Sequence, residues 1–157
     1  MHKQISVLTT GKSRIEAHDR AIGFVQDLIE QGEYDYHMEG SPNATTHKLA
    51  SEMGQLLVEH ALTATRRDFD LSIKAARLML QEFTDDQIYN QQYGEPDPDH
   101  PREYWPSRWQ FSQVGDGDHY LYGERDVWGE AICNDRDYEN ATEGRDDLWI
   151  TEVGVHY

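Results

Sequence analysis

Both ends of the chain alternate apolar and polar residues with a period of two, which is typical of β-strands that bury one face. In residues 3–9, Ile5 and Val7 fall on one side of the segment, and Gly11 ends it. In residues 149–157, every second side chain from Trp149 onward is aromatic, valine or threonine. We therefore predict a strand at each end of the chain and a shorter one at 34–38, where tyrosine and methionine alternate with polar residues.

A helical period of about 3.6 residues follows the first strand. Ser13 can cap a helix that ends at Gly32, and Glu16, three residues later, completes a capping box. Residues 46–64 and 66–83 carry two further apolar stripes, and because the link between them is short, we expect an antiparallel helical hairpin. The side chains expected to face inward are Leu49, Met53, Leu56, Leu57 and then His60 or Ala61 in the first of these helices and Phe69, Ile73, Ala76, Leu80 and Phe83 in the second.

The C-terminal half is predicted to consist of short strands. Aromatic residues alternate on either side of the Gly-Asp-Gly-Asp turn at 115–118, which indicates a β-hairpin. Residues 127–133 are expected to add a third strand, 134–147 a polar loop, and 149–157 the last strand. The chain as a whole thus predicts an α+β fold with a mainly antiparallel sheet, made of an N-terminal β-α-β-like unit and a C-terminal meander and covered on one face by three to four helices.

The length of 157 residues predicts a single α+β domain, 1–157. A short helix from Asp85 to near Tyr93 leads into residues 94–106, which hold four of the five prolines and cannot form regular structure. Tyr104 and Trp105 lie in this stretch, and exposed aromatic side chains on a free linker would favour aggregation. We therefore expect a Pro-rich connector inside one domain.

The charge of the chain is strongly negative and unevenly distributed. Fourteen basic residues stand against 30 acidic ones, for a net charge of −16. Residues 1–78 carry 9 basic and 11 acidic residues, whereas residues 79–157 carry 5 and 19. Nucleic acids and anionic membranes require a basic surface, so direct binding to either is disfavoured, and a charged partner should be basic. A salt-adapted proteome would acidify both halves, so the asymmetry favours a local function.

The remaining composition argues against several other classes of protein. Cys133 is the only cysteine, which excludes an intramolecular disulfide and a thiolate metal cluster. No apolar run reaches the length of a membrane span, and the N-terminus lacks the apolar core of a signal peptide. We expect a cytoplasmic protein with no cofactor, and the sequence does not fix its oligomeric state.

Two patterns leave alternative functions open. Two Asp-x-Asp-His tetrads could bind a hard or borderline cation and support a metal-dependent hydrolase. Their possible ligands are Asp97, Asp99 and His100 in the first tetrad and Asp116, Asp118 and His119 in the second. A glycan-binding module is the other alternative, with Trp128, Tyr120 or Tyr122 as stacking platforms; it requires at least two exposed aromatic rings on one face.

The leading hypothesis rests on the acidic C-terminal half. Outward strand positions and turns could present carboxylates as an array that docks on a basic, nucleic-acid-binding partner surface. The residues expected to contact this partner are Asp116, Asp118, Glu124, Asp126, Glu130, Asp135, Asp137, Glu139, Asp146 and Asp147. The charge pattern is similar in kind to small acidic inhibitors, some of which mimic DNA. The sequence therefore predicts a non-enzymatic interaction or inhibitor protein.

Overall fold

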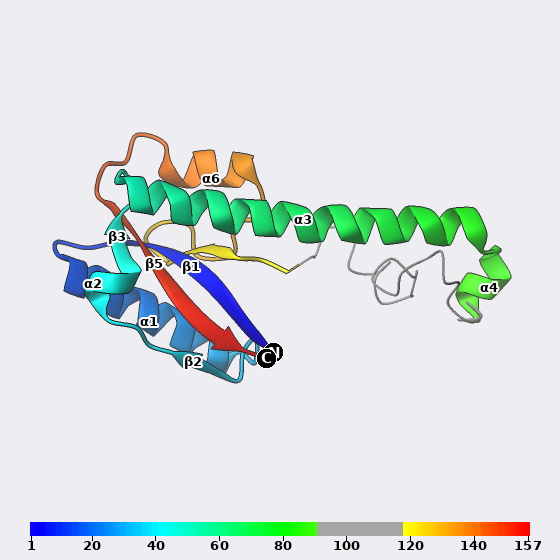
Figure 1. Ribbon diagram of the computed structural model, residues 1–157, viewed down its shortest axis with the longest axis horizontal. Helices are drawn as coiled ribbons and strands as arrows, with labels where there is room; N and C mark the ends of the chain where they lie inside the picture. Colours follow the sequence, from blue (N-terminus) through cyan, green and yellow to red (C-terminus); the bar gives the residue numbers. More distant parts are fainter. Residues whose placement is uncertain (91–117) are drawn as a thin grey trace. The chain divides into compact units, whose positions relative to one another are not determined.

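The computed structural model describes residues 1–90 and 118–157 and confirms the α+β fold class, with five helices and a five-stranded sheet in this part of the chain (Figure 1). The chain divides into two compact units, the first made of Met1–Thr65 and His119–Tyr157 and the second of Arg66–Asp118. The first unit contains the whole described sheet. The predicted connector at 94–106 lies outside the described residues, so the single-domain organisation stays a prediction.

Strands β1 (His2–Thr10) and β5 (Leu148–His156) form the centre of the sheet and confirm the two predicted terminal strands. They pair antiparallel along their whole length, from His2 opposite His156 to Thr10 opposite Leu148. The two chain ends therefore lie side by side (Figure 1), and the Met1 amino group donates a hydrogen bond to the Tyr157 carbonyl oxygen at 2.6 Å.

The other strands flank this central pair. Strands β2 (Tyr36–Met38) and β3 (Thr46–Lys48) both pair antiparallel with β5, while β4 (Leu121–Gly123) pairs parallel with β1. The sheet is mostly antiparallel, as predicted, but the C-terminal meander is wrong, because β1 lies between β4 and β5. The N-terminal β-α-β unit is also split, since β5 inserts between β1 and β2.

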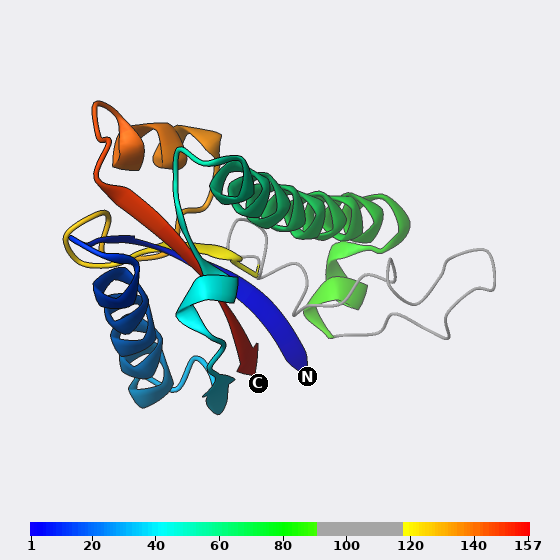
Figure 2. The same ribbon diagram turned by 60° about the vertical axis from the view of Figure 1, so that its left-hand side comes forward.

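Helices cover both faces of the sheet, which corrects the expectation of a single covered face. Helix α1 (Arg14–Glu30) packs on one face, and α6 (Asp135–Thr142) with the first turns of α3 (Glu52–Glu82) lies on the other (Figure 2). Both faces of the central strands are apolar, so both need a covering layer of helices. Ile5 and Val153 face the α1 side, whereas Ile150 belongs to the second core cluster.

Helix α1 begins where the sequence predicts. The Ser13 hydroxyl accepts a hydrogen bond from the Glu16 backbone N–H at 3.2 Å, while the Glu16 carboxylate accepts from the Lys12 N–H at 3.0 Å. The buried face of the helix comprises Ala17, His18, Ala21, Phe24, Val25 and Leu28. Ile15, in the first turn, lies off this face and is 64% exposed.

The predicted helical hairpin is wrong. Residues 46–48 form β3, short helix α2 (Pro42–Thr45) precedes them, and α3 is one uninterrupted helix of 31 residues. No glycine or proline interrupts residues 62–68, so nothing in the local sequence ends the helix there. Its first turns bury Ala61, as predicted, and Val58, which was not predicted, and leave Met53 and Leu56 about half exposed. The inward face is therefore rotated from the predicted one. Helix α4 (Asp85–Tyr89) follows, capped by Thr84 as a capping box with Gln87.

The predicted polar loop at 134–147 contains α6 instead. The Asn134 side chain accepts a hydrogen bond from the Asp137 N–H at 2.9 Å and so caps the helix. In the predicted strand 127–133, only Ala131 bridges a neighbour, Tyr122. The first arm of the expected hairpin lies outside the described residues. Within the described residues, no helix is long and apolar enough to cross a membrane.

Candidate functional site

The acidic residues of the C-terminal half gather around α6 and the two segments that flank it, and we call residues 124–147 the acidic region. Residues 118–157 hold eleven carboxylates and three arginines. The two flanking segments meet, because Arg145 Nη1 donates a hydrogen bond to the Asp126 carbonyl oxygen at 2.9 Å. Figure 2 shows α6 with its flanking loops at one end of β5, on the opposite face of the sheet from α1.

Glu124 is the exception to the expected outward placement of the acids, because it is buried directly after β4. Its Oε1 accepts hydrogen bonds from Arg20 Nε at 3.0 Å and Nη2 at 2.6 Å. Thr10 adds weaker contacts from its backbone N–H at 3.4 Å and its hydroxyl at 3.3 Å. Glu124 therefore ties α1 to the edge of the sheet, and a partner could not reach it.

Asp126 shares the same arginine, with its Oδ2 hydrogen-bonded to Arg20 Nη2. The hydrogen bonds that Arg20 donates, to Asp126 as the larger cause and to Glu124 as the next, raise the pKa of the Arg20 guanidinium above its ordinary value. One cation from the nearly neutral first half is thus enclosed by two anions from the acidic second half. The sequence could not show this pairing, because the residues are 104 and 106 positions apart.

Two further predicted acids also have structural roles. Arg145 donates hydrogen bonds to both carboxylate oxygens of Asp147 at 3.3 Å. This contact, with the nearby charge of Lys48 as a smaller contribution, lowers the pKa of Asp147 below its ordinary value. Asp137 belongs to the N-terminus of α6, where its Oδ2 accepts from the Asn134 amide at 2.9 Å and the Cys133 N–H at 3.3 Å.

The remaining carboxylates of the region are exposed. Among the described residues, none of them forms an ion pair with a basic side chain. They are Glu130, Asp135, Glu139 and Asp146, which the sequence predicts, and Glu143, which it does not. Asp118 is exposed as well, and Asp116 lies outside the described residues. The acidic region therefore contains two groups of acids: those bonded to other residues of the protein and a set of five exposed carboxylates.

Three of the five exposed carboxylates follow α6 at intervals of four residues, and we call Asp135 and Glu139 of the helix and Glu143, its C-cap residue, the acidic stripe. They are spaced four residues apart, so their side chains are neighbours on the helix surface. Like charges at this spacing destabilise a helix by about 0.2–0.5 kcal/mol per pair, and Arg136 can offset only part of this repulsion. Glu139 and Glu143 also lie near the negative end of the helix dipole. Asp135, in the first turn, favours the helix dipole, so the destabilising part of the stripe is Glu139 and Glu143.

A small cavity of about 190 Å³ borders the acidic region. Its lining includes Leu49, Gln55, Leu148, Tyr138 and Arg145. Asp146, one of the exposed carboxylates, lies at its rim. Its volume is below the usual range of small-molecule sites, about 300–1,000 Å³, and suits a single side chain of a partner.

The described residues do not support either alternative, the metal site or the glycan-binding surface. Within residues 1–90 and 118–157, no three His, Cys, Asp or Glu side chains could hold a metal ion together. Asp97, Asp99, His100 and Asp116 lie outside these ranges. His119 Nε2 lies 3.9 Å from Cys133 Sγ, a proximity that the sequence could not show. Of the three predicted stacking platforms, Tyr122 is buried, and Tyr120 and Trp128 are half-buried, so they do not present two exposed rings.

Comparisons with protein-family models, curated proteins and solved structures find no match for this chain. The geometry of the acidic region is therefore the basis on which a function can be argued.

Proposed function

We propose that the protein is a non-enzymatic interaction protein of the cytoplasm whose acidic region docks on a basic surface of another protein. The observation that carries the proposal is the set of five exposed carboxylates around α6 that lack basic partners among the described residues. A partner with lysine and arginine side chains would supply the missing counter-charges. The partner class we favour is a nucleic-acid-binding protein, because its binding channel is basic by necessity.

The internal bonding of the other acids supports this proposal. Arg20 and Arg145 hold Glu124, Asp126 and Asp147 in fixed positions, so the base of the region is ordered before a partner arrives. A preorganised surface loses less conformational entropy on association. The acidic stripe adds repulsion that a basic partner would relieve, so part of the binding free energy would come from removing this repulsion.

The small cavity beside Asp146 gives the acidic region a point of attachment. A lysine or arginine could place its aliphatic stem against Leu49 and Leu148 while its charge meets the Asp146 carboxylate. Long-range attraction would speed the encounter, and salt would slow it, because the Debye length falls to about 10 Å at 0.1 M.

The test compares two variants with the same change in net charge. The stripe variant carries Asp135→Asn, Glu139→Gln and Glu143→Gln. The matched control carries Asp19→Asn, Glu30→Gln and Glu33→Gln, three exposed acids in or just after α1. Binding of a fluorescent deca-arginine peptide is measured by anisotropy at about 50 mM and about 200 mM NaCl.

We expect the stripe variant to bind at least about tenfold more weakly than the native protein at the lower salt concentration, and the control to bind within about twofold. Native binding should weaken strongly at the higher salt concentration. Equal losses in both variants would show that only net charge matters and would refute a dedicated docking surface. A separate competition experiment tests the partner class: the protein should displace double-stranded DNA from the peptide, and failure to do so would refute nucleic-acid mimicry alone.

A further inference from the structure

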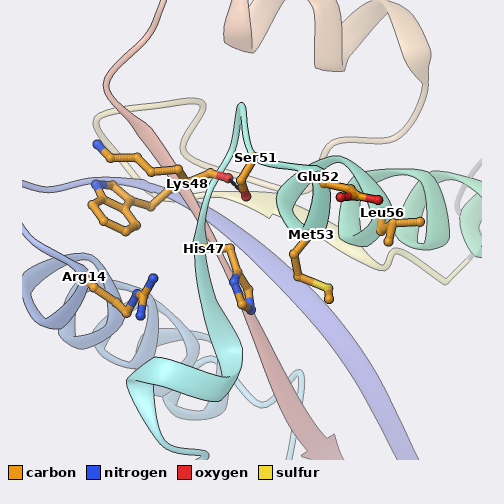
Figure 3. Close-up of a pocket in the computed structure, with 8 residues that line it drawn as sticks. Arg14, His47, Lys48, Ser51, Glu52, Met53 and Leu56 are labelled. Carbon is orange, nitrogen blue, oxygen red and sulfur yellow. Dashed lines mark hydrogen bonds between the residues drawn. The ribbon is translucent and has the colours of Figure 1, made fainter.

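A second site lies away from the acidic stripe, in a cavity of about 590 Å³ between the start of α1, β3 and the start of α3 (Figure 3). We propose that this cavity binds a small organic anion with a flat apolar body, the charge at Arg14 and Lys48 and the body against Met53, Leu56 and Trp149. The inference does not rest on the docking function proposed above. The cavity volume lies within the usual range of small-molecule sites, about 300–1,000 Å³.

The polar half of the site is basic, although the chain is strongly acidic. Figure 3 shows Arg14 of α1 and His47 of β3 extending toward one another across the cavity. Arg14 Nη1 donates a hydrogen bond to the neutral amide oxygen of Asn43 at 3.1 Å, and His47 Nε2 lies 3.1 Å from the Ala44 carbonyl oxygen. Within the described residues, Arg14 forms no ion pair. Its planar fork of N–H donors matches a carboxylate, sulfonate or phosphate group.

Lys48 supplies the second cation. Its Nζ lies 4.1 Å from the centroid of the Trp149 ring, a cation–π contact, and it forms no ion pair with any described residue. Glu52 is the one carboxylate that lines the cavity, and its side chain is exposed at the rim. Two cations therefore line this cavity together with one anion, Glu52, in a chain where acids outnumber bases by more than two to one, and the charge of Lys48 also lies near Asp147.

The apolar half of the site explains why we infer an organic anion and not an inorganic one. Met53 is 47% exposed and Leu56 is 51% exposed, although both belong to an amphipathic helix. The Trp149 side chain also lines the cavity, and its Nε1–H donates a hydrogen bond to the Gly11 carbonyl oxygen at 2.9 Å. A flat apolar body would cover these side chains and gain the free energy of their removal from water.

Two fluorescent probes that share an aromatic body separate charge from hydrophobicity. Anilinonaphthalene sulfonate carries the anion, and N-phenylnaphthylamine lacks it. Titrations use the full-length native protein, Arg14→Gln, Lys48→Gln and Arg77→Gln, an exposed arginine of α3 that serves as the matched control. Circular dichroism verifies that each variant is folded.

We expect one anilinonaphthalene sulfonate per chain, and affinity reduced about tenfold or more by Arg14→Gln, because an ionic hydrogen bond is lost. Lys48→Gln should weaken binding of the anion by several-fold, and Arg77→Gln should leave it unchanged. The neutral probe should bind more weakly to the native protein and respond to none of the variants. Absence of saturable binding, equal affinity for both probes, or equal affinity of Arg14→Gln and Arg77→Gln would overturn the proposal.

Discussion

Replacement of Arg20, the arginine of α1 that pairs with two acids of the acidic region, by methionine should destabilise the fold substantially. Arg20 neutralises two carboxylates, Glu124 through Nε and Nη2 and Asp126 through Nη2. Methionine removes the charge and retains much of the aliphatic stem. The Glu124 carboxylate, whose side chain is only 10% exposed, would then keep only the two long hydrogen bonds from Thr10, at 3.3 and 3.4 Å.

The magnitude follows from how far water can reach the pair. Removing one partner of a fully buried ion pair costs about 3–5 kcal/mol, because the other charge remains desolvated. The Arg20 side chain is 32% exposed, so water can partly solvate the site, and we expect a loss of about 2–3 kcal/mol for Arg20→Met. Glu124→Gln retains a hydrogen-bond acceptor and leaves Asp126 to neutralise Arg20, so its cost should be only about 1–2 kcal/mol.

Urea denaturation at neutral pH measures these free energies of unfolding, and Arg125→Met provides the control. Arg125 forms an exposed ion pair with Asp27 at 3.4 Å, with side chains 81% and 45% exposed. Such pairs contribute about 0–1 kcal/mol, so this substitution should be nearly neutral. If Glu124→Gln were as destabilising as Arg20→Met, or if Arg20→Met matched the Arg125 control, the structural role assigned to Glu124 would be refuted.

Three further predictions concern stability. Glu139→Gln should raise the free energy of unfolding by about 0.2–0.5 kcal/mol at low salt and have no effect at about 1 M salt; a loss of stability would contradict repulsion along the acidic stripe. Arg145 lowers the pKa of Asp147 in the folded state, so the ion pair stabilises the protein only where Asp147 is charged. The difference in unfolding free energy between the native protein and Asp147→Asn should therefore be constant well above the ordinary pKa of 3.8 and shrink as the pH falls below that value. A difference that grows in acid would contradict the pairing. The Tyr34 and Tyr122 hydroxyls lie 2.8 Å apart in the core, so Tyr34→Phe should cost about 1 kcal/mol, and the double Phe variant should cost less than the sum of the two single ones.

The sequence predicts those elements whose signals are local. Helix α1 begins after Ser13 and α4 begins at Asp85, as predicted, and the alternation of apolar residues predicts β1 and β5. Helix α6 was missed because its composition is polar, although Asn134 followed three residues later by Asp137 was an available capping signal. The predicted helical hairpin is wrong because the short link between its two apolar stripes contains no glycine or proline, so nothing in the local sequence ends the helix there.

The sequence also could not show the contacts between residues that are far apart in the chain. The parallel pairing of β4 with β1 joins residues more than a hundred positions apart, and local alternation carries no information about which strand is the neighbour. The same distance hid the contact between Glu124 and Arg20, so a residue expected on the outer surface proved to be buried. Likewise, Arg14 and Trp149 come from opposite ends of the chain, and only the fold places them at one cavity.

Mapping of backbone amide chemical shifts most directly tests whether the acidic region is the docking surface. The full-length protein is titrated with deca-arginine at about 50 mM NaCl, and the titration is repeated at about 200 mM. We predict saturable shift changes at Glu130 and along residues 135–147, with little change along α1, and a strong reduction at the higher salt concentration. Shift changes that cluster at Asp19 and Glu30 on α1, or that are spread evenly over the acidic residues of the whole chain, would contradict the proposed function.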